Sequence, residues 1–153
     1  MVTFVPGFVS RQVAEYGSEM QRVNAELRQR FAGDDAARRR ELDAWRESHP
    51  TPKATLKDVA DHIDHIRKVA GVDHIGIGSD FYTAANQESM AKGLEDVSRY
   101  PYLFAELLRR GYSDEDALKI AGRNHLRAMR QMEKTAAQLQ KSEPPLITEG
   151  VAK

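Results

Sequence analysis

Residues 74–81 read HIGIGSDF, and the interpretation of the whole chain starts from this stretch. Side chains alternate between the two faces of a strand, so both isoleucines fall on one face, while both glycines and Asp80 fall on the other. The isoleucine face suits packing against helices, and the glycine face leaves room for a crowded interior or a ligand. The sequence therefore predicts a short apolar strand within residues 72–81 that ends on a carboxylate.

The remaining elements follow from turn signals and apolar spacing. VTFV, residues 2–5, predicts a strand that stops at the Pro6-Gly7 turn. Apolar residues at helical spacing predict helices over about residues 10–31, 36–48, 56–70, 100–111, 113–122 and 124–140.

Two of these helices carry recognisable end signals. Thr55 and Asp58 form a capping-box pattern, and the helix that they begin is expected to bury Val59, Ile63, Ile66 and Val69. Ser113 is expected to begin the 113–122 helix and Gly122 to end it.

The order of strands and helices indicates an α/β fold with parallel pairing. Parallel strands are normally covered and paired on both sides, and two of them leave open edges. The chain therefore reads as part of an α/β domain.

Composition excludes several classes of function. The 153 residues contain 23 Lys plus Arg and 23 Asp plus Glu, so no basic field is present to attract nucleic acid. The chain has no cysteine, which excludes disulfides and thiolate metal ligands. Its apolar start is interrupted by Pro6 and Gly7 and predicts neither a signal peptide nor a membrane span. We expect a soluble protein, cytoplasmic if the sequence is complete as given; otherwise its compartment is unknown.

Asp80 is the candidate site residue. It lies at the carboxyl end of its predicted strand, the end that carries the catalytic residues in a (β/α)₈ barrel. Capping of the following segment explains an aspartate there equally well. Position alone leaves both interpretations open.

Longer stretches carry a resemblance to a known family. DVADHIDHIRKVAGVDHIGIGSDF (58–81) and GLEDVSRYPYLFAELLRRGYSDEDALKIAGRNHLRAM (93–129) resemble the C-terminal part of the membrane (renal-type) dipeptidases, and VTFVPGF (2–8) resembles their penultimate barrel strand. These are zinc metallo-hydrolases on a (β/α)₈ barrel. The resemblance implies a partial (β/α)₈ barrel over residues 1–141, made of the last two strand–helix units with extra helices. A flexible tail is expected over residues 142–153.

The resemblance also implies a chemistry. In the family, two zinc ions and a bridging hydroxide hydrolyse a dipeptide. The family's metal ligands precede the part that this chain resembles, so no metal ligand and no bound zinc are expected here. The family's strand-end aspartate falls on Asp80, which would be both catalytic and substrate-binding: it would contact the free amino group and assist protonation of the leaving amine. The loop over residues 82–92 departs from the family's Asp-Phe-Asp-Gly pattern, so its role and the substrate preference stay open.

Other polar residues are weaker candidates for a functional site. His62, His65 and His74 lie close in sequence. Surface histidines beside aspartates explain His62 and His65 more simply than a metal site, and His74 begins the predicted strand, at the end where residues serve stability. Glu95 and Asp96 are expected to order their loop and cap the next helix. The run Arg38–Arg40 is expected to be a solvated helix face.

Two functions from different classes remain. The first is the C-terminal segment of a zinc-dependent dipeptidase, inactive alone, whose partners are a dipeptide substrate and the missing barrel portion. The alternative is a non-catalytic assembly module that associates with itself or completes a partner's sheet. Whether this chain is an enzyme by itself stays open.

Overall fold

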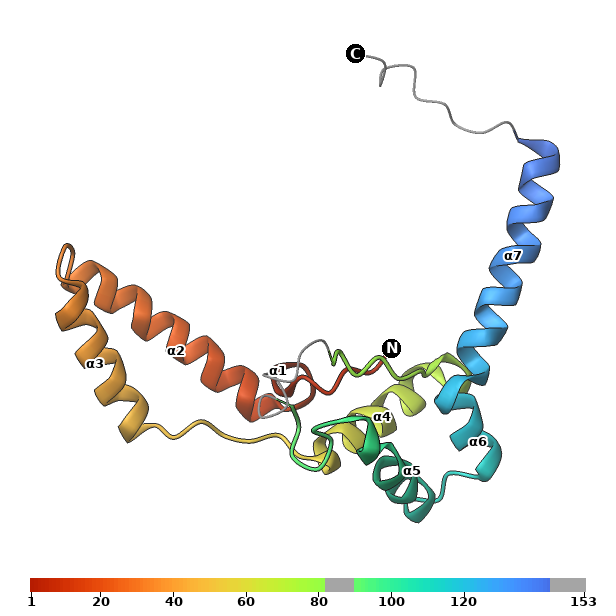
Figure 1. Ribbon diagram of the computed structural model, residues 1–153, viewed down its shortest axis with the longest axis horizontal. Helices are drawn as coiled ribbons and strands as arrows, with labels where there is room; N and C mark the ends of the chain where they lie inside the picture. The colour runs from red at the N-terminus through yellow and green to blue at the C-terminus, as the bar shows by residue number, and fades with distance from the viewer. Residues whose placement is uncertain (82–89, 144–153) are drawn as a thin grey trace.

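The computed structural model describes residues 1–81 and 90–143, and these form mainly helices. A central body carries a helical hairpin at one end and a long helix at the other, so the chain forms an open arc (Figure 1). The helices are α1 (Pro6–Val9), α2 (Arg11–Arg30), α3 (Asp35–Ser48), α4 (Leu56–Ala70), α5 (Tyr100–Arg109), α6 (Asp114–Leu118) and α7 (Asn124–Ser142). Two 3₁₀ turns, η1 (Val72–His74) and η3 (Val97–Arg99), and a π-helical turn, η4 (Lys119–Arg123), connect some of them.

The predicted α/β class, a partial (β/α)₈ barrel, is wrong for this chain: the described residues contain no assigned strand. The two segments predicted as strands do run parallel, and the Val2 N–H donates to the Gly76 carbonyl at 2.7 Å. Their pairing, however, is a single bridge between Val2 and Ile77. Each extended segment is too short for a ladder, because α1 begins at Pro6 and η1 occupies residues 72–74. A second isolated bridge joins Thr55 to Lys92.

One hydrophobic core holds the central body together. It lies between the paired segments, α4 and α5, and continues to η4. Its largest fully buried side chains are Phe4, Ile63, Ile75, Leu94, Leu103, Leu107, Ile120, Val2 and Val59. Residues between Val2 and Ile120 meet here, so the extended segments contribute to the core although they form no sheet.

α4 begins as the sequence predicts. The Thr55 N–H donates to the Asp58 carboxylate at 2.8 Å, which completes the capping box. Val59 and Ile63 are buried, and Ile66 packs against the core from its edge. Val69 is 71% exposed, so its predicted burial is wrong. The reason is position, since Val69 lies in the last turn of α4, beyond the core.

α2 and α3 form a hairpin that extends from the body (Figure 1). α2 has no buried residue, and α3 has one, Leu42. Tyr16 of α2 packs on Trp45 of α3 at 5.3 Å between ring centroids, and Trp45 stacks on His49. Aromatic contacts and Leu42, more than a continuous apolar seam, therefore hold this polar hairpin together.

The C-terminal part departs from the sequence prediction at one glycine. Ser113 caps α6 as predicted, since its hydroxyl accepts from the Asp116 N–H. The helix does not end at Gly122, because η4 carries the helical path across the kink into α7. The described helices include none long and apolar enough to cross a membrane.

A buried asparagine holds the start of α7 to the body. The Asn124 side-chain amide donates to the carbonyls of Val72 at 2.7 Å and Ile75 at 2.8 Å. Lys119 adds an ion pair to Asp73 at 2.8 Å. Side chains of α7 and η4 thus help to position the predicted strand region, in addition to its backbone bonds to residues 2–4.

Candidate functional site

Asp80 follows the segment that pairs with the N-terminus, and its side chain is exposed. Its backbone φ is 68°, and it is the one non-glycine residue with positive φ among those described. Aspartate tolerates this left-handed conformation better than most residues, but it still costs free energy. Such a conformation persists only where its neighbours are held firmly.

The residues on both sides of Asp80 are held in this way. Ser79 is buried, its carbonyl accepts from the Phe4 N–H at 3.2 Å, and its hydroxyl accepts from the Tyr100 hydroxyl at 2.9 Å. The Phe81 ring packs edge-on against Phe4 at 5.7 Å and lies 6.2 Å from Tyr100. These contacts fix the backbone on either side, so the Asp80 carboxylate projects from a fixed turn.

The sequence analysis did not identify Tyr100 as the residue that anchors this turn. A signal was present in the sequence. Ser79 shares the apolar face of Ile75 and Ile77, and a buried hydroxyl requires a hydrogen-bond partner. The identity of that partner, 21 residues along the chain, is given only by the tertiary contact.

The glycine face that was expected to leave space is partly covered by Met1. A Cβ atom added to Gly78 would lie 3.0 Å from the Met1 Cε atom, a distance that requires a shift of that side chain. Gly78 thus allows a close approach of the N-terminus, as glycine in an extended segment often does.

The histidines of α4 and η1 are the other residues that could suggest a metal site. His65 and His74 are exposed, and His62 is half-buried. Within residues 1–81 and 90–143, no group of three or more His, Cys, Asp or Glu side chains is placed to hold a metal ion. The donor set of these residues therefore does not fit a zinc site, and we derive no reaction step through a metal.

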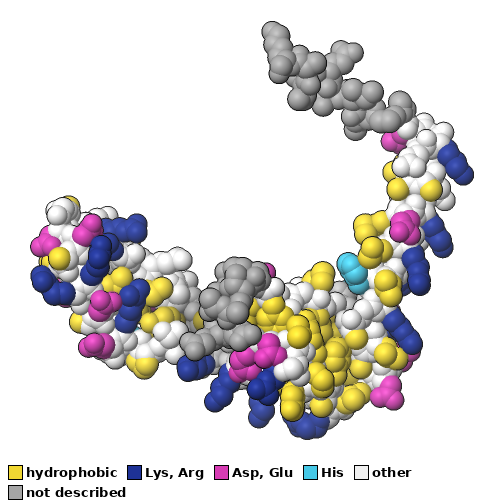
Figure 2. Space-filling view, viewed as in Figure 1, with side chains coloured by type: hydrophobic (Ala, Val, Ile, Leu, Met, Phe, Trp, Pro, Cys, Tyr) yellow, Lys and Arg dark blue, Asp and Glu magenta, His cyan; other side chains and the backbone are white. Residues whose placement is uncertain are grey.

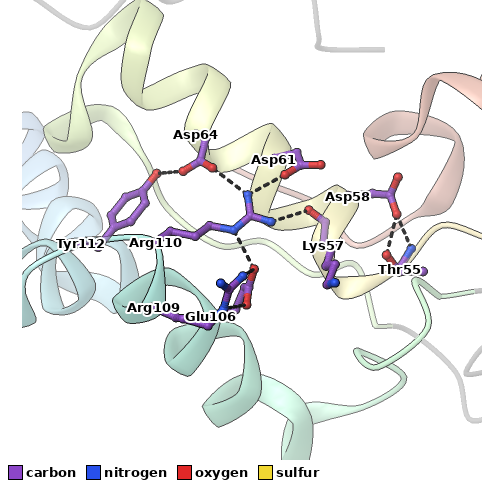
Figure 3. Close-up of polar contacts among 9 residues, drawn as sticks. All are labelled: Thr55, Lys57, Asp58, Asp61, Asp64, Glu106, Arg109, Arg110 and Tyr112. Carbon is purple, nitrogen blue, oxygen red and sulfur yellow. Dashed lines mark hydrogen bonds and ion pairs between the residues drawn. The ribbon is translucent and has the colours of Figure 1, made fainter.

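The densest charge cluster joins α4 to α5 (Figure 3). Arg110 pairs with Glu106 at 2.8 Å, with Asp61 at 2.6 Å and with Asp64 at 2.7 Å. Asp64 also accepts from the Tyr112 hydroxyl at 2.8 Å. Every carboxylate in the cluster has a partner, which is the pattern of a structural tie between helices.

The pKa values in the cluster reflect the same pairing. Hydrogen bonds from Arg109 and Arg110 lower the pKa of Glu106 to about 2. Burial, together with the hydrogen bond to Asp64, raises the pKa of Tyr112. Both groups keep their normal charge at neutral pH, so neither is prepared for proton transfer there.

A cleft of about 770 Å³ lies beside the loop that leads into α4, a volume within the range of small-molecule sites. Its charged lining side chains are Lys53, Lys92 and Glu95, and Asp80 is not among its described lining residues. Glu95 accepts the Gly93 N–H at 2.7 Å, which lowers its pKa. Asp96 accepts the Ser98 N–H at 2.8 Å. These bonds confirm that Glu95 and Asp96 order their loop. Asp96 caps the 3₁₀ turn η3, while α5 itself has no side-chain cap.

Comparison with known proteins gives a consistent result. The family model for membrane dipeptidase (peptidase family M19) matches residues 1–143. A dipeptidase of Claviceps purpurea is 41% identical over 107 residues, which cover 70% of this chain and 24% of that protein. A dipeptidase of Clonostachys rogersoniana is 40% identical over 95 residues, which cover 62% of this chain and 24% of that protein.

A solved structure is also similar. The crystal structure of the probable dipeptidase PvdM from Pseudomonas aeruginosa matches with a TM-score of 0.56 and 31% identity. The match covers 82% of this chain and 35% of that one. The chain spans about a quarter of the length of the curated relatives that it matches.

Proposed function

Because this chain belongs to the membrane dipeptidase family, we propose that it forms one part of a zinc-dependent dipeptidase, the part that carries a substrate-side carboxylate. The relatives that it matches are dipeptidases, which supports a dipeptide as the substrate. The remaining part of such an enzyme is needed for turnover, and this chain alone is inactive.

The observation that carries the proposal is the way Asp80 is displayed. An exposed carboxylate in a left-handed turn, anchored on both sides by Ser79 and Phe81, has a fixed direction without the support of a sheet. Strained backbone held in place by its surroundings clusters at functional sites. Simple capping of a surface loop does not require this strain.

The role of Asp80 follows from its charge. A dipeptide carries a free ammonium group, and a carboxylate binds it through a charge-assisted hydrogen bond. Bound there, the substrate is oriented with its peptide bond at a fixed distance from the acid. The same carboxylate would take the proton that the attacking water loses and pass it to the leaving amine when the peptide bond breaks.

Zinc belongs to the proposal through the family, whose members are metallopeptidases. Bound zinc would supply a nucleophilic hydroxide and polarise the peptide carbonyl. Since the described residues offer no suitable donor set, the ligands would come from the remaining part of the enzyme. Residues of this chain would bind and orient the substrate.

The first test uses residues 1–153 alone, with zinc added and dipeptide hydrolysis measured. We expect no turnover above a blank. Turnover together with one or two tightly bound zinc ions per chain would show that the chain is a complete catalyst and would overturn the proposal.

The second test uses a chimaera in which residues 1–143 replace the matching segment of the Claviceps purpurea dipeptidase. We expect Asp80→Asn to lower kcat/KM of this chimaera about 10²- to 10⁴-fold, the usual contribution of a positioned acid or base. Asp43→Asn, on the exposed surface of α3, is the matched control and should leave kcat/KM unchanged. Equal activities for the two variants would remove Asp80 from the site.

A second candidate function is a non-catalytic assembly module. The apolar side chains left exposed at the surface favour it, among them Phe8, Tyr102 and Leu118. Sedimentation equilibrium of residues 1–153 separates the two functions. A stable oligomer of this chain alone, with an inactive chimaera, would support the assembly module.

A further inference from the structure

α7 makes little contact with the body for a helix of its length. Of its 19 residues, only Asn124, at its first turn, is buried. From there the helix runs away from the central body, along one arm of the arc (Figure 1).

The apolar side chains of α7 nevertheless gather on one face. Met129, Met132, Ala136 and Leu139 are spaced three, four and three residues apart, which places them on one side of a helix; we call them the α7 stripe. Met132 is 62% exposed, Leu139 46% and Met129 41%. Figure 2 shows apolar side chains on the side of α7 that faces the hollow of the arc, and cations on the outer side.

The cations make the pattern two-sided. Arg127, Arg130, Lys134 and Lys141 lie on the opposite face from the stripe. Such a division is typical of a helix with one side in solvent and the other against an apolar partner. Helices in proteins draw most of their stability from packing of the apolar face, so a stripe without a partner is a sign of a missing contact.

The comparisons indicate what makes this contact. The family match extends to residue 143, so the stripe lies inside the dipeptidase domain and is not an appended segment. About three quarters of each matched relative lies outside the match. We expect a region of that size to supply the apolar surface that the described residues do not place against the stripe.

We propose that the α7 stripe packs against the part of a dipeptidase chain that this sequence does not span. The inference rests on the proposed function and adds the surface through which the two parts join. The stripe faces the hollow between α7 and the α2–α3 hairpin (Figures 1 and 2), so the occupant fills this hollow. A second copy of the chain and a flat lipid bilayer are the other occupants that the experiment distinguishes.

The test introduces the same charge on opposite faces of α7 in the chimaera defined above. Met132→Lys places an ammonium group in the stripe, and Gln138→Lys, on the polar side, is the matched control. Both positions are exposed in the chain alone, so neither variant disturbs a core that already exists. We expect Met132→Lys to lower the melting temperature of the chimaera by several degrees and Gln138→Lys to leave it unchanged.

The second part of the experiment tests the same two variants in residues 1–153 alone. We expect Met132→Lys and Gln138→Lys to have equal melting temperatures there, because the described residues bury neither position. If sedimentation shows a dimer that Met132→Lys dissociates, the occupant is a second copy and the proposal is wrong. Co-sedimentation with phosphatidylserine vesicles that Met132→Lys abolishes would assign a bilayer instead.

The remaining outcomes separate this inference from the proposed function. A stable chimaera that depends on Met132 but hydrolyses no dipeptide keeps the packing surface and overturns the proposed function. An active chimaera that tolerates Met132→Lys and Gln138→Lys equally overturns the packing surface and keeps the function. If the chimaera is insoluble while the parent dipeptidase, prepared in the same way, is soluble, the result contradicts the proposed packing of the α7 stripe.

Discussion

Replacing Arg110 by methionine should destabilise the chain by about 3 kcal/mol. The guanidinium of Arg110 joins α4 to α5 through Asp61, Asp64 and Glu106 (Figure 3). Methionine keeps much of the apolar stem and removes the charge, so the change isolates the ion pairs.

The magnitude follows from the burial of each partner. The Glu106 side chain is 11% exposed and that of Arg110 is 16%, so their pair is nearly buried, and breaking such a pair costs about 3–5 kcal/mol. The contact of Arg109 with Glu106 remains and reduces this loss. Asp61 is 70% exposed, and its pair contributes about 1 kcal/mol or less.

Urea unfolding followed by circular dichroism at 222 nm measures the change, since the described residues are mainly helical. Arg109→Met is the matched control, because Arg109 contacts the same Glu106 carboxylate from a largely exposed position. We expect no measurable loss for Arg109→Met. Equal losses for the two variants, or none for Arg110→Met, would refute the burial argument.

Three further predictions concern single residues. Asn124→Ala should cost about 2 kcal/mol in urea unfolding, because the carbonyls of Val72 and Ile75 lose their donor, while His125→Ala, on the exposed side, should be neutral. The pKa of Glu106 is lowered from 4.5 to about 2, so its ion pairs stabilise the folded chain above pH 4.5, and that stability is lost as the pH falls from about 4.5 to about 2. The free energy of unfolding of Glu106→Gln should therefore fall less steeply with falling pH in this range than that of the unchanged chain, as acid unfolding would measure. Asp80→Gly should raise the free energy of unfolding by about 1 kcal/mol, because glycine adopts a φ of 68° without strain. The same change should abolish turnover of the chimaera. A loss of stability would show instead that the carboxylate has a structural role.

The helices were predictable because their signals are local. The capping box at Thr55, the helix start at Ser113 and the burial of Val59 and Ile63 on α4 follow from neighbouring residues, and the structure confirms them. The paired segments were predicted as strands for equally local reasons: the alternation of isoleucine and glycine in residues 75–78, and the run VTFV before the Pro6-Gly7 turn. A strand, however, needs a partner along several residues, and the chain provides one bridge between Val2 and Ile77.

The candidate site was predictable only in part. The sequence placed Asp80 after an extended segment and its resemblance gave the residue a role, which stays a prediction. Neither indicated that the backbone of Asp80 is left-handed or that Tyr100 anchors Ser79 beside it. These features depend on contacts between residues far apart in the chain, such as Phe4 with Phe81 and Tyr100 with Ser79.

The sequence by itself determined the family and the positions of most helices, because motif order, helix caps and apolar spacing are properties of the chain as written. Only the tertiary structure decided which apolar residues are buried. Val59 and Ile63 enter the core, while Val69 on the same helix and Met132 on α7 stay in solvent. Burial depends on the surface that lies opposite each side chain, and for α7 we infer that this surface belongs to the rest of a dipeptidase.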